Sequence, residues 1–193
     1  MTKDQKNAFT SITRNNKNYS ENFDKSNLGS QPAKSIVILT CMDTRINPLK
    51  LCGLKVGEAH IIRNAGGRVT DDAIRSLIIS YKLLGTKDWF IIQHTDCGLS
   101  KITDEKITNL LEIDLETAIF ENGDWRGNKN SNSESGSTDG SKIKWYTFSN
   151  LRESILEDLE KINNHSLIPK NINVYGFIYD VKTGKLEFIE ASK

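Results

Sequence analysis

Ser35-Ile-Val-Ile-Leu-Thr-Cys-Met-Asp-Thr-Arg45 is the stretch that decides the fold, because it opens with a continuous apolar run and closes on residues that carry chemistry. The run from Ile36 to Leu39 is rich in β-branched residues and has no polar position, which is typical of a strand buried on both faces. The same pattern returns in residues 60–62, 89–92 and 172–179. These runs predict the strands of a buried central sheet.

Helical periods separate the apolar runs. Each has a capping side chain at its start and aliphatic residues that recur with helical spacing. The helices begin at Thr70, at Thr103 and at Ser149 or Asn150, and their apolar faces include Leu77, Leu111, Leu115 and Leu159. Strands that alternate with helices predict an α/β fold with a mainly parallel sheet of about four strands, flanked by helices. Residues 181–189, with a turn at Thr183 and Gly184, predict a short antiparallel edge strand.

The 193 residues fit a single domain with two polar segments attached to it. Residues 1–34 predict an N-terminal arm, made of a short helix and a polar tether. Residues 121–142 are almost free of aliphatic side chains, so they cannot bury enough surface to order themselves. We expect a flexible surface insertion there, with a binding or regulatory loop as the alternative.

Composition excludes several kinds of partner. The 26 Lys and Arg residues nearly balance 25 Asp and Glu residues, so nothing favours a nucleic acid or an anionic membrane as partner. No apolar run reaches the roughly 18 residues that a membrane span needs. The N-terminus lacks the apolar core of a secretory signal, so we expect a cytoplasmic protein whose three cysteines are thiols or metal ligands.

Metal-binding residue types follow two of the predicted strands. Cys41 ends the first strand, and His94 and Cys97 follow the third. Ligands in open α/β sheets collect at the carboxyl ends of strands, and two thiolates with one imidazole form a zinc site whose fourth position stays open for catalysis. Inert buried cysteines and a hydrogen-bonded core histidine are the alternative. Cys52, His60 and His165 are not grouped with other ligand residues at the predicted strand ends, and we interpret them as structural.

Further candidates lie beside these ligands. If the chain stays extended after the first strand, Asp43 and Arg45 leave it on the same face as Cys41, and a paired carboxylate stays ionised and oriented. An ordinary surface ion pair is the alternative. Gly66 and Gly67 lack Cβ atoms, so their backbone either approaches a substrate closely or forms a tight turn before Thr70.

The motifs Cys41-x-Asp43-x-Arg45, Arg63-Asn-Ala-Gly-Gly67 and His94-Thr-Asp-Cys-Gly98 resemble the β-class carbonic anhydrases. The segments Leu167-Ile-Pro-Lys170 and Gly176-Phe-Ile-Tyr-Asp180 resemble the small, archaeal-type branch of that family, which also includes COS and CS2 hydrolases. The resemblance implies one zinc per chain on Cys41, His94 and Cys97, a catalytic dyad of Asp43 and Arg45, and a homodimer as the minimal unit, with the arm packed on the partner.

The implied activity is the lyase reaction that hydrates CO2 reversibly to bicarbonate, with a zinc-bound hydroxide oriented by the dyad. Asp43 could also rotate onto the metal and close the site as a fourth ligand. Each of the two thiolates repels a hydroxide about 4 Å away by about 4 kcal/mol at an effective dielectric of 20, so activity should rise on the alkaline side. Gln93 stands where many relatives of this branch have a second His, and the proton-relay residue is left unassigned.

Two alternatives to CO2 hydration remain. COS or CS2 hydrolysis needs the same hydroxide on the same scaffold. A noncatalytic zinc-binding or redox-sensing protein would instead use Cys41 and Cys97 as switchable thiols.

Overall fold

The computed structural model describes residues 3–130 and 132–190, and the chain divides into two units, one up to Ser30 and one from Gln31 onward. Residues 1 and 2 of the expected arm and residue 131 of the expected insertion lie outside this description. The first unit contains helix α1 (Lys3–Glu21), which is longer than the short helix that we expected. It leaves Phe9, Ile12 and Tyr19 largely exposed. Within the described residues, no helix combines the length and the apolar character that a bilayer span requires.

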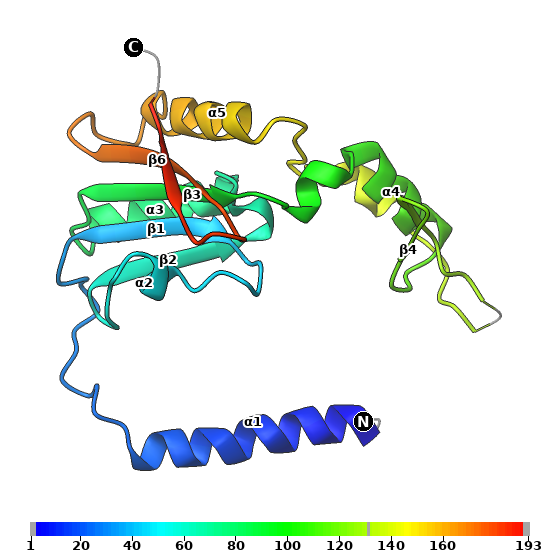
Figure 1. The fold of residues 1–193 in the computed structure, drawn as a ribbon, viewed down its shortest axis with the longest axis horizontal. Coiled ribbons are helices and arrows are strands. Elements are labelled where there is room, and N and C mark those ends of the chain that lie inside the picture. The colour runs from blue at the N-terminus through cyan, green and yellow to red at the C-terminus, as the bar shows by residue number, and fades with distance from the viewer. Residues whose placement is uncertain (1–2, 131, 191–193) are drawn as a thin grey trace. The chain divides into compact units, whose positions relative to one another are not determined.

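The second unit is built on a five-stranded sheet, which Figure 1 shows with helices packed around it. Strands β2, β1, β3 and β6 are neighbours in that order and run parallel, and β7 pairs antiparallel with β6 at the edge. The strand bounds are β1 Ile36–Cys41, β2 Ala59–Asn64, β3 Asp88–His94, β6 Asn173–Tyr179 and β7 Leu186–Ile189. This arrangement confirms the α/β fold with an antiparallel edge strand.

Two helices supply the main core on one face of the sheet. They are α3 (Asp71–Lys82) and α5 (Leu151–Asn163), and their apolar residues pack against Val37, Leu39, Trp89 and Ile91. Thr70 caps α3 by accepting a hydrogen bond from the Ala73 amide, and Asn150 caps α5 in the same way. The predicted helix starts are therefore correct.

The other face of the sheet is covered only in part. Helix α2 (Pro48–Leu51) lies there, followed by the half-buried Cys52. An apolar cavity of about 310 Å³ remains beside it. Its lining includes Ile36, Ile38, Cys52, Phe90 and Phe177. Cys52 thus lies among apolar side chains, and burial raises the pKa of its thiol.

Helix α4 (Asp104–Ile113) begins after its Thr103 cap, as predicted, but it ends before Leu115. Asp114 adopts an extended conformation and pairs with Ser135, so Leu115 falls outside the helix and is 48% exposed. The cause is a tertiary contact that helical spacing cannot reveal.

The segment expected to be a flexible insertion, 121–142, contains regular structure. Strands β4 (Ile119–Glu121) and β5 (Asp124–Arg126) form a hairpin, and the short helix η3 (Thr138–Lys142) packs against α4. The Ser137 amide donates to the Leu111 carbonyl at 2.7 Å, and Gly140 is buried against the Leu111 side chain. Backbone hydrogen bonds and close packing at glycine therefore hold this segment against α4, although it has few aliphatic side chains to bury.

Candidate metal centre

Three candidate ligands meet at the carboxyl edge of the sheet. Cys41 is the last residue of β1, His94 is the last residue of β3, and Cys97 immediately precedes the short helix η2 (Gly98–Lys101). Their possible ligand atoms all lie within 4.8 Å of one another, and all three residues are buried. The fold thus brings together the three residues that the sequence singles out as ligands.

The hydrogen bonding of His94 leaves one ring nitrogen available. Its Nδ1 lies 2.8 Å from the Thr95 carbonyl oxygen, which can only accept a hydrogen bond, so Nδ1 must carry the proton. Its Nε2 is buried and has no hydrogen-bond partner among the described residues. A buried polar atom without a partner is costly, and a metal ion would satisfy the Nε2 lone pair.

The two thiols complete a donor set that suits zinc. A hydrogen bond from Cys97 lowers the pKa of the Cys41 thiol, and the same contact raises the pKa of Cys97, since both cannot ionise at this distance without a cation. Two sulfurs and one imidazole form a ligand set that zinc binds tetrahedrally, with one position left over. The residues present therefore fit a zinc ion.

Asp43 and Arg45 form a bidentate pair, although the chain does not stay extended, which was the condition of the argument from sequence. The chain turns after β1, with the Ile46 amide donating to the Asp43 carbonyl at 3.1 Å. The Arg45 amide and Nε both donate to Asp43 Oδ1, at 2.9 and 3.0 Å, and Nη2 donates to Oδ2 at 2.8 Å. These hydrogen bonds from Arg45 lower the pKa of Asp43 to about 2, so its carboxylate is ionised at any physiological pH. Asp43 Oδ2 lies 3.9 Å from His94 Nε2, beside the ligand cluster.

Sequence reasoning missed two residues that hold this turn in place. Arg63 donates from Nε to the Cys41 carbonyl at 3.0 Å and from Nη2 to the Asp43 carbonyl at 2.7 Å. Asp96 accepts from Arg45 on the opposite side of the turn. Both residues stand in the motifs quoted above. Their contacts join positions 20 or more apart in the sequence, so spacing alone could not have identified them.

A cleft of about 500 Å³ opens onto the ligands. Its lining consists of Cys41, Met42, Asp43, Thr44, Arg45, Ala65, Gly66, His94, Cys97, Gly98 and Leu99. Gly66 lines the cleft, whereas Gly67 lies against strand backbone: a Cβ on Gly67 would fall 2.8 Å from the Cys41 amide nitrogen. Of the two glycines, Gly66 is therefore the one whose backbone borders the cleft, and Gly67 instead packs against the strands.

Gln93 points to the other side of β3 from His94, because side chains alternate along a strand. Its Nε2 donates to Asp158 Oδ2 at 2.9 Å, and its Oε1 accepts from the Ser154 hydroxyl. Asp158 also accepts from Arg68 Nε at 2.9 Å, and all four residues are buried. This network, Gln93–Ser154–Asp158–Arg68, ties β3 to α5 and to the turn after β2, and it places Gln93 away from the cleft.

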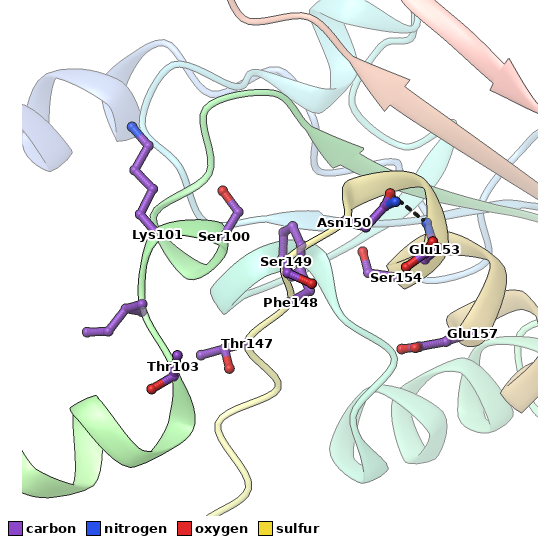
Figure 2. Close-up of a pocket in the computed structure, with 11 residues that line it drawn as sticks. Ser100, Lys101, Thr103, Thr147, Phe148, Ser149, Asn150, Glu153, Ser154 and Glu157 are labelled. Atoms are coloured by element: carbon purple, nitrogen blue, oxygen red, sulfur yellow. Dashed lines mark hydrogen bonds between the residues drawn. The ribbon is translucent and has the colours of Figure 1, made fainter.

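A larger cavity, of about 550 Å³, lies between η2 and the first turn of α5 (Figure 2). Hydroxyl groups and the carboxylates of Glu153 and Glu157 line it, with Lys101 at its edge. It shares no lining residue with the cleft, and no Cys or His is among the described residues around it. The larger cavity therefore offers none of the sulfur and imidazole ligands that suit zinc, whereas the smaller cleft contains all three candidate ligands.

Similarity to known proteins identifies the family of this chain. The family model described as carbonic anhydrase matches residues 36–186. A β-carbonic anhydrase 1 from Mycobacterium tuberculosis is 37% identical over 174 residues, covering 89% of this chain and 91% of its own length. A carbon disulfide hydrolase from Saccharolobus solfataricus is 37% identical over 167 residues, covering 77% of this chain and 74% of its own. The crystal structure of a carbonic anhydrase from Streptococcus mutans superimposes with a TM-score of 0.77 at 36% identity, covering 94% of this chain and 97% of that one. The chain therefore belongs to the β-carbonic anhydrase family of lyases.

Proposed function

We propose that this protein catalyses the reversible hydration of CO2 to bicarbonate with a zinc ion held by Cys41, His94 and Cys97. One observation carries the proposal: the buried Nε2 of His94, which has no hydrogen-bond partner in the described part of the chain, lies beside two thiols in a cleft that also contains an ionised carboxylate. The similarity to a β-carbonic anhydrase over nine-tenths of both chains supports the same reaction.

Zinc, when bound, supplies Lewis-acid chemistry that lowers the pKa of a water molecule. Asp43 orients that attacking water, since an ionised carboxylate can only accept a hydrogen bond and so leaves a lone pair of the water free to face CO2. Arg45 keeps the Asp43 carboxylate in this orientation through two side-chain hydrogen bonds. The Gly66 backbone and Leu99 leave a largely apolar wall, which suits a small apolar substrate.

A second substrate class is favoured by a specific observation: one carbon disulfide hydrolase, from Saccharolobus solfataricus, has the same 37% identity to this chain as the mycobacterial carbonic anhydrase. CO2, COS and CS2 are linear triatomic molecules that the same activated water can attack. We place CO2 first because the carbonic anhydrase covers more of both chains.

We also propose a homodimer, with the N-terminal arm packed on the partner. The support is apolar surface that stays exposed within each unit, as far as the structure describes its residues. Phe188 and Leu186 of β7 are 53% and 37% exposed. Leu186 lines the apolar cavity beside α2, and the Phe188 ring lies 5.4 Å from that of Phe177, which lines it too. Helix α1 likewise exposes an apolar stripe that includes Phe9 and Ile12. Exposed apolar surface of this kind is typical of an interface between subunits.

One preparation tests these points together. Stopped-flow CO2 hydration, zinc quantification and sedimentation equilibrium should give an active protein with one zinc per chain and the mass of a dimer or a multiple of it.

The rate of CO2 hydration should rise toward alkaline pH, because two thiolate charges oppose deprotonation of the attacking water. A flat profile of kcat/KM from mildly acidic to alkaline pH would contradict this. Substoichiometric zinc without hydration would instead favour the redox-sensing alternative, and parallel assays with COS and CS2 decide the substrate.

Replacing Asp43 by asparagine should lower kcat by about 10²-fold while the zinc content stays at one per chain. The amide keeps the size of the side chain but presents a donor where the attacking water needs an acceptor. Zinc should be retained because Asp43 pairs with Arg45 and lies outside the three-ligand cluster. Asp139→Asn is the matched control, because this exposed carboxylate pairs with Lys142 and does not line the cleft. Full activity in Asp43→Asn would remove this residue from the mechanism.

A further inference from the structure

The Arg45 guanidinium is held by two carboxylates. Asp43 occupies the edge formed by Nε and Nη2. Asp96 occupies the other edge: its Oδ2 accepts from Nη1 at 2.8 Å, and its backbone carbonyl accepts from Nη2 at 3.1 Å. Four guanidinium N–H groups are thereby engaged from two directions, which fixes the plane of the group as well as its position.

The backbone at Asp96 is shaped for this contact. Asp96 has a φ of +56°, in the left-handed region that side-chain-bearing residues rarely adopt, and it lies between the candidate ligands His94 and Cys97. This conformation lets the carboxylate and the carbonyl of a single residue reach the same guanidinium. A non-glycine residue in this region is strained, and such strain is found most often at functional sites, where it serves a purpose.

We propose that Asp96 is a positioning residue, which holds Arg45 in place so that Arg45 in turn orients Asp43. This inference rests on the proposed function for its effect on catalysis. If Asp43 turns away from Arg45, the guanidinium loses its side-chain bonds on one edge but keeps those to Asp96 on the other. The Arg45 guanidinium then keeps its position and orientation, so the Asp43 carboxylate can form the same hydrogen bonds again when it turns back.

Lys101 distinguishes this arrangement from a simple surface ion pair. Its Nζ donates to Asp96 Oδ1, so the two carboxylate oxygens serve different cations, Oδ1 for Lys101 and Oδ2 for Arg45. Lys101 therefore fixes the rotation of the Asp96 carboxylate, and Asp96 fixes Arg45. The contacts therefore run from Lys101 of η2 to Asp96 and from Asp96 to Arg45. Arg45 in turn holds the Asp43 carboxylate.

Asp96→Gly is the informative variant, because glycine accepts the positive φ and keeps the backbone carbonyl while it removes the carboxylate. We expect kcat to fall about tenfold with zinc unchanged at one per chain, since hydrogen bonds between charged groups at a half-exposed site have about this effect. Asp96→Asn also tolerates this conformation and keeps an acceptor oxygen, so it should retain most of the activity. Asn122→Gly, which relieves a φ of +52° in the β4–β5 turn, is the matched control and should behave as wild type.

A double-mutant cycle with Arg45→Ala separates positioning from a structural effect. If Asp96 acts through Arg45, Asp96→Gly causes no further loss of kcat in the Arg45→Ala background. An equal loss in both backgrounds, a loss of zinc, or wild-type activity in Asp96→Gly would overturn the proposal.

A measurement on the metal-free protein tests the contact without relying on activity. Nitrogen-15 NMR, with Arg45→Lys used for assignment, should show hindered rotation of the Arg45 guanidinium in the wild type and about tenfold faster rotation in Asp96→Gly. Equal rotation rates in the two proteins would overturn the proposal. A wild-type protein that binds zinc but hydrates no CO2 would overturn the proposed function instead, and the rotation rates would still decide whether Asp96 holds Arg45.

Discussion

Replacing Cys97 by alanine will leave the protein without stoichiometric zinc and will reduce CO2 hydration at least about a thousandfold. Residues that merely support a metal ligand typically change activity or metal affinity by about 10–100-fold, so loss of one of three ligands must exceed this. The remaining pair, Cys41 and His94, cannot build a tetrahedral site alone. Zinc measured in the purified protein, together with stopped-flow hydration, gives both results from one sample.

Cys52→Ala is the control for this prediction. Cys52 belongs to the same unit as Cys97, but it is half-buried among the apolar residues beside α2 and lies outside the ligand cluster. Its replacement should leave zinc content and turnover at the wild-type level. A Cys97→Ala protein that still binds one zinc per chain would show that the cluster is not the metal site.

Replacing Gly67 by alanine should have the largest effect on stability. The new Cβ would lie 2.8 Å from the Cys41 amide nitrogen and 2.9 Å from the Thr40 carbonyl carbon, both of which belong to a central strand and cannot move aside. A left-handed conformation costs a non-glycine residue about 1–2 kcal/mol, and overpacking adds about 1–3 kcal/mol. We therefore expect a loss of about 2–5 kcal/mol in the free energy of unfolding, measured with urea.

Gly85→Ala isolates the contribution of the backbone conformation. Gly85 has a φ of +76°, close to the +66° of Gly67, but a Cβ there would meet no heavy atom within 4 Å. Only the conformational cost of about 1–2 kcal/mol should remain. If the two variants are equally stable, crowding against β1 has no part in the requirement for glycine at position 67.

The sheet was predictable because apolar runs in the sequence coincide with its parallel strands. Residues 36–39 and 89–92 fall within β1 and β3, and the edge strand β7 follows the turn at Thr183 and Gly184 as expected. The ligand set was predictable for a related reason: the carboxyl ends of neighbouring parallel strands meet at one edge, so Cys41 and His94 had to come close together.

What the sequence concealed depends on contacts between distant residues. The turn that brings Asp43 to Arg45 is held by Arg63, and the early end of α4 at Asp114 depends on Ser135. The order within the expected insertion likewise depends on hydrogen bonds to the end of α4. None of these pairings follows from local propensity or spacing, because each requires the folded chain to bring its partners together.

The Gln93–Ser154–Asp158–Arg68 network has a consequence for the order of assembly. A slip of β3 by one residue would exchange the directions of Gln93 and His94, so the network on one side of the strand selects the alignment that the imidazole needs on the other. Folding can therefore complete the ligand cluster before any metal arrives. Zinc would then bind to a preformed, rigid site, and its uptake would not be a late step of folding.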